Sequence, residues 1–237
     1  MIALVTGASR GIGAAIAEAL AAAGYDLYLT CDKSYEDLER VADSLSEKYG
    51  VNAIPYQTDM SDEVMVLKLF EDMDDLDVLV NNAGISYIGQ LQDMEFEDWH
   101  RVLGVNLDSV FLTCRQAAEI MIRKQSGCII NISSVWGERG ASMEVAYSAS
   151  KGGVNAFTRA LAKELAPSHV RVNAISCGVI DTDMNSCFTK EEMDSIIEDI
   201  PADRLGEASE VADIVVMLTK SPDYLTGQII TVDGGYT

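Results

Sequence analysis

The chain has 237 residues, 48% of them hydrophobic, and a formal net charge of −21. A surface this acidic repels the phosphates of nucleic acids and anionic lipids, so we expect neither as a partner. No apolar run approaches the length of a membrane span, and the first residues lack the features of a signal peptide. Five scattered cysteines without a CxxC pair disfavour a disulfide framework and a structural metal site. We therefore expect one cytoplasmic domain over residues 1–237, without a bound metal.

Short aliphatic runs alternate with amphipathic segments along the chain. The strand-like runs are Ile2–Val5, Leu27–Thr30, Ala53–Gln57, Val78–Val80, Cys128–Ile132, Val170–Ala174 and Gln228–Val232. Apolar residues at helical spacing separate them, and two of these patterns predict long helices over Phe96–Lys124 and Val145–Ala166. Strands that alternate with helices form right-handed crossovers and a parallel sheet covered on both faces. The sequence therefore predicts an α/β fold, a doubly wound seven-stranded parallel sheet of the Rossmann type.

A glycine-rich segment, Thr6–Gly13, follows the first predicted strand and opens a helix. Glycine is needed where φ is positive or where a ligand must approach the backbone closely. The start of the helix beyond it offers free N–H groups and a positive dipole end. In this context the segment predicts a site for the pyrophosphate of a dinucleotide.

Tyr147 and Lys151 stand four residues apart at the start of a predicted helix, and Ser134 precedes the tyrosine by thirteen positions. Residues at i and i+4 share one helix face. A nearby cation lowers the pKa of a phenol, and a phenol tuned in this way exchanges a proton with a carbonyl oxygen. Together with the glycine segment, the pair predicts hydride transfer between a nicotinamide and a carbonyl.

Four motifs in order resemble the short-chain dehydrogenase/reductase family from end to end. They are Thr6–Gly13, Asn81-Asn82-Ala83-Gly84, Ser134 with Tyr147-x-x-x-Lys151, and Val232-Asp233-Gly234-Gly235. The resemblance implies a nicotinamide cofactor and a catalytic tetrad of Asn106, Ser134, Tyr147 and Lys151. It makes Tyr147 the acid/base, and Lys151 the group that binds the ribose and depresses the pKa of the tyrosine. It also implies that Ser134 donates to the substrate oxygen and that Asn106 holds a water beside Lys151.

The resemblance also implies a set of cofactor contacts, with Asp59 at the adenine, Ile180 at the carboxamide and Thr182 at a phosphate. The full set of expected contacts, in which Asp32 and Lys33 are included for their position near the end of the second predicted strand, is Gly7, Ser9, Arg10, Gly11, Ile12, Gly13, Asp32, Lys33, Asp59, Met60, Asn82, Ala83, Gly84, Tyr147, Lys151, Ile180 and Thr182. The usual Pro-Gly after the sixth strand reads Cys177-Gly178 in this chain. Because proline stiffens a turn, we expect a looser loop over Val179–Met184.

The residues that bear on the choice between NAD(H) and NADP(H) favour different cofactors. Asp32, near the end of the second strand, suits the ribose 2′-OH of NAD, although in the family alignment the acid belongs at Cys31, which is neutral. Arg10 occupies the position that meets the 2′-phosphate in NADP-preferring relatives, and Lys33 adds a second cation. Arginine beside a phosphate makes a strong charge-assisted hydrogen bond. We therefore favour NADP(H) over NAD(H).

Within the family, the chain most resembles bacterial 3-oxoacyl-[acyl-carrier-protein] reductases. The matching segments are Asn173-Ala174-Ile175, Ile180–Met184 and Arg204-Leu205-Gly206. Those reductases carry basic residues that dock an acidic carrier, and the matching positions here are Cys128 and Ser168. A carrier would then need another basic patch, for which Arg123, Lys124 and Arg171 are candidates.

Trp136–Val145 suggests a different substrate. This stretch looks like a branch of Gram-positive reductases, some of which reduce an aminopentanone group on a lysine of elongation factor P. Glu138 and Glu144 near the catalytic mouth would suit such a cationic amine, unless both face solvent. The substrate thus stays open between an oxoacyl thioester, a ketone on a modified protein and a small ketone or steroid. A lid helix over Thr189–Ile200 would cover it.

Two readings from other classes compete with an enzyme. A non-catalytic dinucleotide sensor should have lost Tyr147 or Lys151, and both are present. A scaffolding subunit would use the two long predicted helices only for assembly. By resemblance those helices build a homotetramer that is also catalytic.

Overall fold

The computed structural model describes residues 1–237 and contains one seven-stranded sheet, in the order β3-β2-β1-β4-β5-β6-β7. All strand pairs are parallel. The strands are β1 (Ile2–Val5), β2 (Asp26–Cys31), β3 (Ala53–Gln57), β4 (Val78–Asn81), β5 (Gly127–Ser134), β6 (Val170–Cys177) and β7 (Ile229–Val232). The strand order reverses at β1, and ligands of such sheets bind beyond the carboxyl ends at this reversal. The predicted fold class is confirmed.

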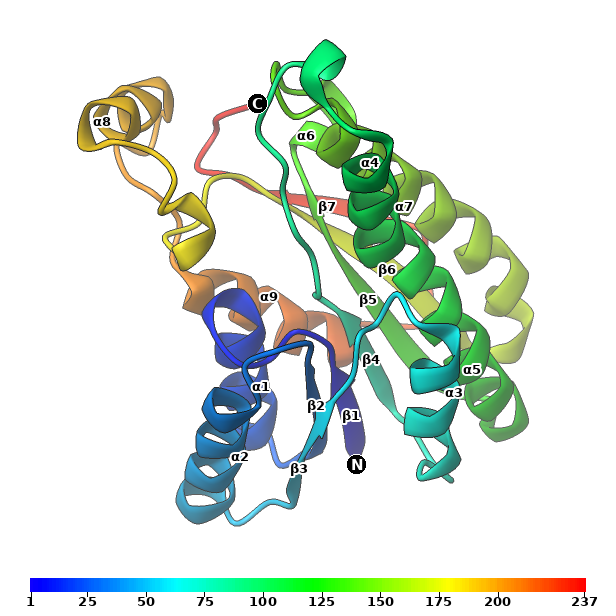
Figure 1. The fold of residues 1–237 in the computed structure, drawn as a ribbon. Helices are drawn as coiled ribbons and strands as arrows, with labels where there is room; N and C mark the ends of the chain where they lie inside the picture. Colours follow the sequence, from blue (N-terminus) through cyan, green and yellow to red (C-terminus); the bar gives the residue numbers. More distant parts are fainter.

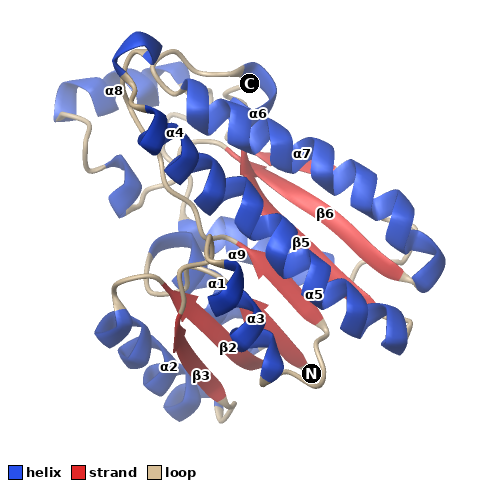
Figure 2. Ribbon diagram, turned by 45° about the vertical axis from the view of Figure 1, so that its right-hand side comes forward, coloured by secondary structure: helices blue, strands red, loops and turns tan.

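Helices cover both faces of the sheet (Figures 1 and 2). One face carries α1 (Gly11–Ala22), α2 (Tyr35–Tyr49) and α9 (Ala208–Thr219). The other carries α3 (Glu63–Glu71), α4 (Phe96–Leu103), α5 (Ser109–Lys124) and α7 (Val145–Leu165). The remaining elements are α6 (Trp136–Arg139), α8 (Lys190–Asp199) and 3₁₀ turns at Leu91–Asp93, Ala166–Ser168 and Asp183–Asn185. No helix combines the length and the apolar character that crossing a bilayer requires.

Alternation along each strand divides the core into two layers. Val78 and Val80 of β4 pack under α1 and α9, whereas Leu79 between them packs under α5. Since successive side chains of a strand point to opposite faces, a strand covered on both sides must be apolar throughout. This is why the central strands read as unbroken aliphatic runs.

The predicted strands all exist, and the two longest extend beyond their predicted ends. β5 continues to Ser134 and β6 to Cys177, with Ser133, Ser134 and Ser176 each buried. The prediction ended where the apolar run ended, but the backbone pairing continues through these polar residues. The extra residues carry the chain to the carboxyl edge, where the site lies.

The long helix expected over Phe96–Lys124 is helical throughout, but its α-helical pattern is interrupted once. A π-helical turn at Gly104–Asp108 separates α4 from α5. A π-turn places one extra residue in the helix and is frequent at functional sites. Asn106 lies inside this turn and is buried.

Candidate active site

A cavity of about 170 Å³ lies at the carboxyl edge of the sheet. Ser134 from the end of β5, with Tyr147 and Lys151 from α7, forms part of its wall. Ile12 at the start of α1 and Ile180 after β6 form another part. The sequence therefore folds so that its glycine segment and its tyrosine–lysine pair share one cavity.

The glycine segment forms a cradle that side chains would fill. Gly7 has φ +67°, and a Cβ there would lie 2.9 Å from the Cα of Ala83. A Cβ on Gly13 would lie 2.1 Å from the carbonyl oxygen of Gly7. No side chain caps the start of α1, and no acidic residue lies in its first turn. These free N–H groups and the open backbone fit a pyrophosphate.

The segment after β4 supports this cradle from the side. The hydroxyl oxygen of Thr6 accepts hydrogen bonds from the backbone N–H groups of Asn82 and Ala83, both at 3.0 Å. The amide of Asn82 donates to the carbonyl oxygens of Thr6 (2.9 Å) and Gly7 (3.0 Å). The side chain of Asn82 thus shapes the glycine segment. Gly84 follows, and a Cβ there would lie 3.5 Å from the Lys151 ammonium.

Tyr147 and Lys151 lie on one face of α7, as predicted. The Lys151 ammonium is buried, donates to the carbonyl oxygen of Ile132 at 2.8 Å, and lies 5.6 Å from the centre of the Tyr147 ring. Burial lowers the pKa of Lys151 to about 8. Removal from water therefore weakens the cation that was expected to act on the phenol.

The expected depression of the tyrosine pKa is wrong for this structure. Burial raises the pKa of Tyr147 above its ordinary value, a hydrogen bond with Ser134 offsets part of the rise, and the charge of Glu144 adds to it. Sequence spacing gives the partner of the phenol but not the depth at which the pair is buried. Tyr147 is consequently a protonated phenol at neutral pH.

Replacing Lys151 by methionine tests the energetic consequence of this burial. The folded protein releases the lysine proton near pH 8, whereas an unfolded chain holds it to a pKa of about 10.4. The destabilisation from burying a charged amine, about 3 kcal/mol, is therefore complete below pH 8 and fades as the pH rises toward about 10.4. Calorimetry should show the Tm of Lys151→Met, relative to the unchanged protein, falling by several degrees between about pH 7 and pH 9.5.

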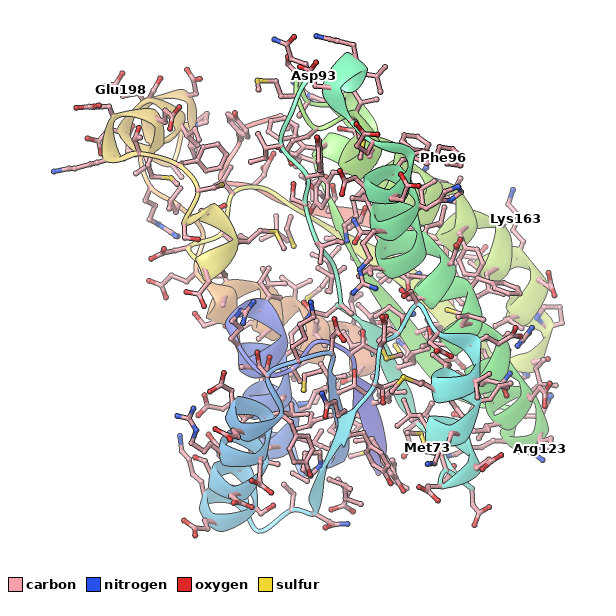
Figure 3. The ribbon with its side chains drawn as sticks, in the orientation of Figure 1. Met73, Asp93, Phe96, Arg123, Lys163 and Glu198 are labelled. Carbon is pink, nitrogen blue, oxygen red and sulfur yellow. The ribbon has the colours of Figure 1, made fainter.

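A second lysine on the same helix provides the control for that measurement. Lys163 lies on α7 and is exposed (Figure 3). Lys163→Met should leave the pH dependence of the Tm unchanged. A Tm difference for Lys151→Met that does not vary with pH would contradict the burial of a charged amine.

Two adjacent serines reach the cavity from β5. The Ser134 hydroxyl accepts from the backbone N–H of Trp136 at 3.2 Å and interacts with Tyr147. The Ser133 hydroxyl donates to the carbonyl oxygen of Lys151 at 3.4 Å. Ser133 is thus engaged with the α7 backbone, while Ser134 lies beside the phenol, in line with the expected assignment.

Asn106 joins the π-turn to the loop after β4 and to α7. Its amide donates to the carbonyl oxygen of Ile85 (2.9 Å) and to the hydroxyl of Ser150 (3.0 Å), and its oxygen accepts from the Ile85 N–H (2.9 Å). Both amide hydrogens are therefore engaged within the protein. Because Ser150 precedes Lys151, Asn106 positions the part of α7 that bears the lysine.

A model of the short chain dehydrogenase family matches residues 1–193. The chain belongs to the short-chain dehydrogenase/reductase family. It is 41% identical over 236 residues to the "uncharacterized oxidoreductase YmfI" of Bacillus subtilis (strain 168), covering 99% of this chain and 98% of that one. It is 42% identical over 239 residues to the 3-oxoacyl-[acyl-carrier-protein] reductase FabG of Aquifex aeolicus (strain VF5), covering 99% and 96%.

A solved structure gives the same fold. The crystal structure of YwfH, described as an NADPH-dependent reductase involved in bacilysin biosynthesis, superposes with a TM-score of 0.94 at 26% identity. The match covers 100% of this chain and 98% of that one. This short-chain dehydrogenase/reductase is accordingly an NAD(P)-dependent oxidoreductase.

Ion pairs hold two of the residues predicted at the adenosine end of the oxidoreductase. Arg101 of α4 pairs with Asp32 after β2 at 3.1 Å and with Asp59 after β3 at 2.8 Å. The sequence analysis did not single out Arg101. In the sequence Arg101 is simply a charged residue one turn before the π-turn, and it cannot be told apart from other charged residues on helix surfaces.

The remaining residues predicted at this end differ in exposure. Arg10 is exposed and pairs with Asp183 at 3.6 Å, and Lys33 is exposed without an ion pair. Ser9, between Ala8 and Arg10, is partly buried. Met60 is buried, and its sulfur accepts from the Thr30 hydroxyl at 3.4 Å, so its side chain serves the core.

The loop after β6 is fastened near its start. Cys177 is the last residue of β6 and is buried, in a strand position opposite Val232. The Asp181 N–H donates to the carbonyl oxygen of Gly206 at 2.8 Å, and the Gly206 N–H donates to that of Val179 at 3.0 Å. These bonds hold Ile180 against the cavity without proline at position 177. Thr182 also lines the cavity, and its methyl group lies near Gly11.

The two glutamates expected at the mouth of the catalytic site have different environments. Glu144 lines the cavity, is half-buried and accepts from the Ser86 hydroxyl at 2.8 Å. Burial raises its pKa, and the hydrogen bond offsets part of the rise. Glu138 is exposed, pairs with Arg159 at 3.5 Å and does not line the cavity. Of the two, only Glu144 lines the cavity.

The predicted lid is a helix beside the cavity. α8 begins with a capping box between Thr189 and Glu192. Ile196 lines the cavity, and Met193 and Ile197 are partly buried beside it. The ribbon shows α8 standing out from the body of the protein, with Glu198 on its outer surface (Figures 1 and 3).

Proposed function

We propose that this protein is an NADP(H)-dependent carbonyl reductase of the 3-oxoacyl-[acyl-carrier-protein] reductase type. One observation carries the proposal. A single cavity is lined by Ser134, Tyr147 and Lys151 on one side, and by Ile12 and Ile180 from the dinucleotide-binding segments on the other. A carbonyl in this cavity could meet a proton donor and a nicotinamide together.

The side chains of the cavity divide the work on the substrate oxygen. A bound reduced nicotinamide would supply hydride to the carbonyl carbon. Tyr147 donates its phenolic proton to the oxygen as negative charge develops there, and the Ser134 hydroxyl stabilises the same charge. Lys151 would hold the ribose and restore the proton of Tyr147. Asn106, through Ser150, holds the part of α7 that bears Lys151 in position. The product is a secondary alcohol.

Tyr147 is in the protonation state that ketone reduction requires. Burial raises the pKa of Tyr147, so the phenol carries its proton at neutral pH. A reductase needs a proton donor in its resting state, whereas alcohol oxidation needs a phenolate.

Arg10 and Lys33, both exposed, support NADP(H) over NAD(H), as does the NADPH dependence stated for YwfH.

The substrate we propose first is a 3-oxoacyl thioester, supported by the likeness to FabG. The basic patch suggested for carrier docking does not form, because Arg171 is buried against the carbonyl of Thr219 and pairs with Asp223, and Lys124 pairs with Asp75. Arg123 lies at the far end of α5 from the turn that joins it to α4 (Figure 3). A carrier protein would therefore have to dock elsewhere.

A second candidate substrate is a ketone that carries an amine. The supporting observation is Glu144, a half-buried carboxylate in the cavity wall whose charge no lysine or arginine neutralises. An ammonium group on the substrate would form an ion pair with the Glu144 carboxylate. The aminopentanone of a modified elongation factor P is such a ketone, while small ketones and steroids lack the charge.

The first experiment follows NADPH oxidation with acetoacetyl-CoA and, separately, with an amine-bearing methyl ketone. Rapid oxidation with acetoacetyl-CoA is the expected result. Oxidation with the amino ketone alone, abolished by Glu144→Gln, would favour the second candidate. Bound NADPH that neither ketone oxidises would contradict both and leave the non-catalytic sensor.

We also propose a homo-oligomer, a tetramer by resemblance, and a lid role for α8. Large apolar side chains of α4 and α5 are exposed, with Phe96 at 68% and Phe111 at 47%. Exposed apolar residues on adjoining helices suit an interface between copies of the chain.

A further inference from the structure

Arg101 closes a three-residue cluster at the edge of the sheet. One guanidinium nitrogen lies 3.1 Å from Asp32 and another lies 2.8 Å from Asp59. The same arginine is 3.4 Å from the Ser61 hydroxyl, which itself donates to Asp59 at 2.6 Å. Residues from three separate segments are thus joined by one cation.

The two carboxylates lie where the proposed function places the adenosine. Asp32 follows β2 and Asp59 follows β3, at the carboxyl ends of two adjacent strands. The side chains of Asp32 and Arg101 are each 42% exposed, so a ligand can reach both. The inference below therefore rests on the proposed function.

The charges at this point decide which dinucleotide fits. A carboxylate accepts a hydrogen bond from a ribose 2′-OH and repels a 2′-phosphate, which carries a charge of about −1.5 to −2. Asp32 and Asp59 alone would place two negative charges at the adenosine end, that of Asp32 beside the 2′ position. Arg101 reduces their sum to −1 and occupies an oxygen of Asp32 that would otherwise accept from the hydroxyl.

We propose that Arg101 is a positioning residue that sets the cofactor preference by neutralising Asp32. In this arrangement Arg10 and Lys33 contact the 2′-phosphate directly. Arg101 neutralises the charge of Asp32, which would otherwise repel that phosphate. This resolves the conflict in the sequence between an acid that suits NAD and cations that suit NADP. The preference thus depends on a residue of α4, far along the chain from the other determinants.

Cofactor binding without any ketone tests this inference. We would titrate the protein with NADPH and with NADH and follow the fluorescence of Trp136, which lines the cavity. The variants are Arg101→Gln, Asp32→Asn and the double variant. Because one unit charge at close range changes binding about tenfold or more, Arg101→Gln should weaken NADPH binding at least that much. NADH binding should change less than about threefold, and Asp32→Asn should restore NADPH binding in the double variant.

Two further arginines provide controls. Arg10→Ala should weaken NADPH selectively without rescue by Asp32→Asn, since Arg10 acts on the phosphate itself. Arg115→Gln removes the surface ion pair between Arg115 of α5 and Glu63 of α3, outside the site, and should change neither titration. The binding of 2′,5′-ADP against 5′-AMP should reproduce the NADPH and NADH pattern, because these fragments differ only in the 2′-phosphate.

If Arg101→Gln weakened the binding of NADPH and of NADH equally, the inference would be overturned. Arg101 would then have only a structural role, as the ion-pair partner of Asp32 and Asp59. Selective loss without rescue by Asp32→Asn would also overturn it, in favour of direct contact between Arg101 and the phosphate. An unmutated protein that binds neither dinucleotide would contradict the proposed function itself. That result is distinguished before any variant is made.

Discussion

Tyr147→Phe is expected to lower kcat for ketone reduction by about 10²–10⁴-fold, because the phenol is the proton donor at the substrate oxygen. Phenylalanine keeps the ring and removes only the hydroxyl. The dissociation constant for NADPH should therefore stay close to that of the unchanged protein. Steady-state kinetics with the ketone identified above, together with a fluorescence titration of NADPH, gives both quantities.

A second tyrosine in the cavity wall is the matched control. Tyr236 packs edge-on against Trp136, with ring centres 5.7 Å apart, and both rings line the cavity. Tyr236→Phe also removes a phenolic hydroxyl from the cavity wall, but not the proposed proton donor. The fall in kcat should therefore be much smaller than for Tyr147→Phe. If Tyr147→Phe kept more than half of the activity, Tyr147 would not be the acid/base.

Gly13→Ala is expected to abolish dinucleotide binding and to lower the Tm. The added methyl would lie 2.1 Å from the Gly7 carbonyl oxygen and 2.6 Å from the Asn82 amide nitrogen. Neither atom can yield, because the Asn82 amide is bonded to the Gly7 and Thr6 carbonyls that form the cradle. Overpacking of this kind destabilises by about 1–3 kcal/mol. Thermal melts and NADPH titrations measure the two effects.

The control for that substitution is Gly104→Ala. Gly104 also has a negative φ, and its added Cβ would meet only the Ser61 Cβ, at 3.4 Å, which is ordinary van der Waals contact. This variant should bind NADPH and melt much as the unchanged protein does. Equal losses from the two substitutions would mean that any added methyl is harmful, and that the cradle is not special.

The layered fold could be predicted because burial on both faces makes each strand apolar. Runs such as Val78–Val80 therefore stand out in the sequence and were confirmed. The ends of β5 and β6 were missed because Ser133, Ser134 and Ser176 are polar and still buried within the sheet. Local composition does not reveal polar residues that are buried within a sheet.

The residues of the cavity were also within reach of sequence reasoning, but their energetics were not. Spacing along α7 brings Tyr147 and Lys151 onto one face, and the structure places both in the cavity wall. The direction of the tyrosine pKa depends on how far the pair lies from water, which is a property of the whole fold. Arg101 was missed because its partners Asp59 and Asp32 lie 42 and 69 positions away in the chain.

The helix that carries Arg101 also leads directly to Asn106, inside the π-turn. At about 1.5 Å per residue, the two side chains are separated by about 7–8 Å along one axis. The first pairs with the carboxylates at the adenosine end, and the second holds the stretch of α7 that bears Lys151. One continuous helical segment therefore carries both the residue that pairs with Asp32 and Asp59 and the residue that holds α7 beside Lys151.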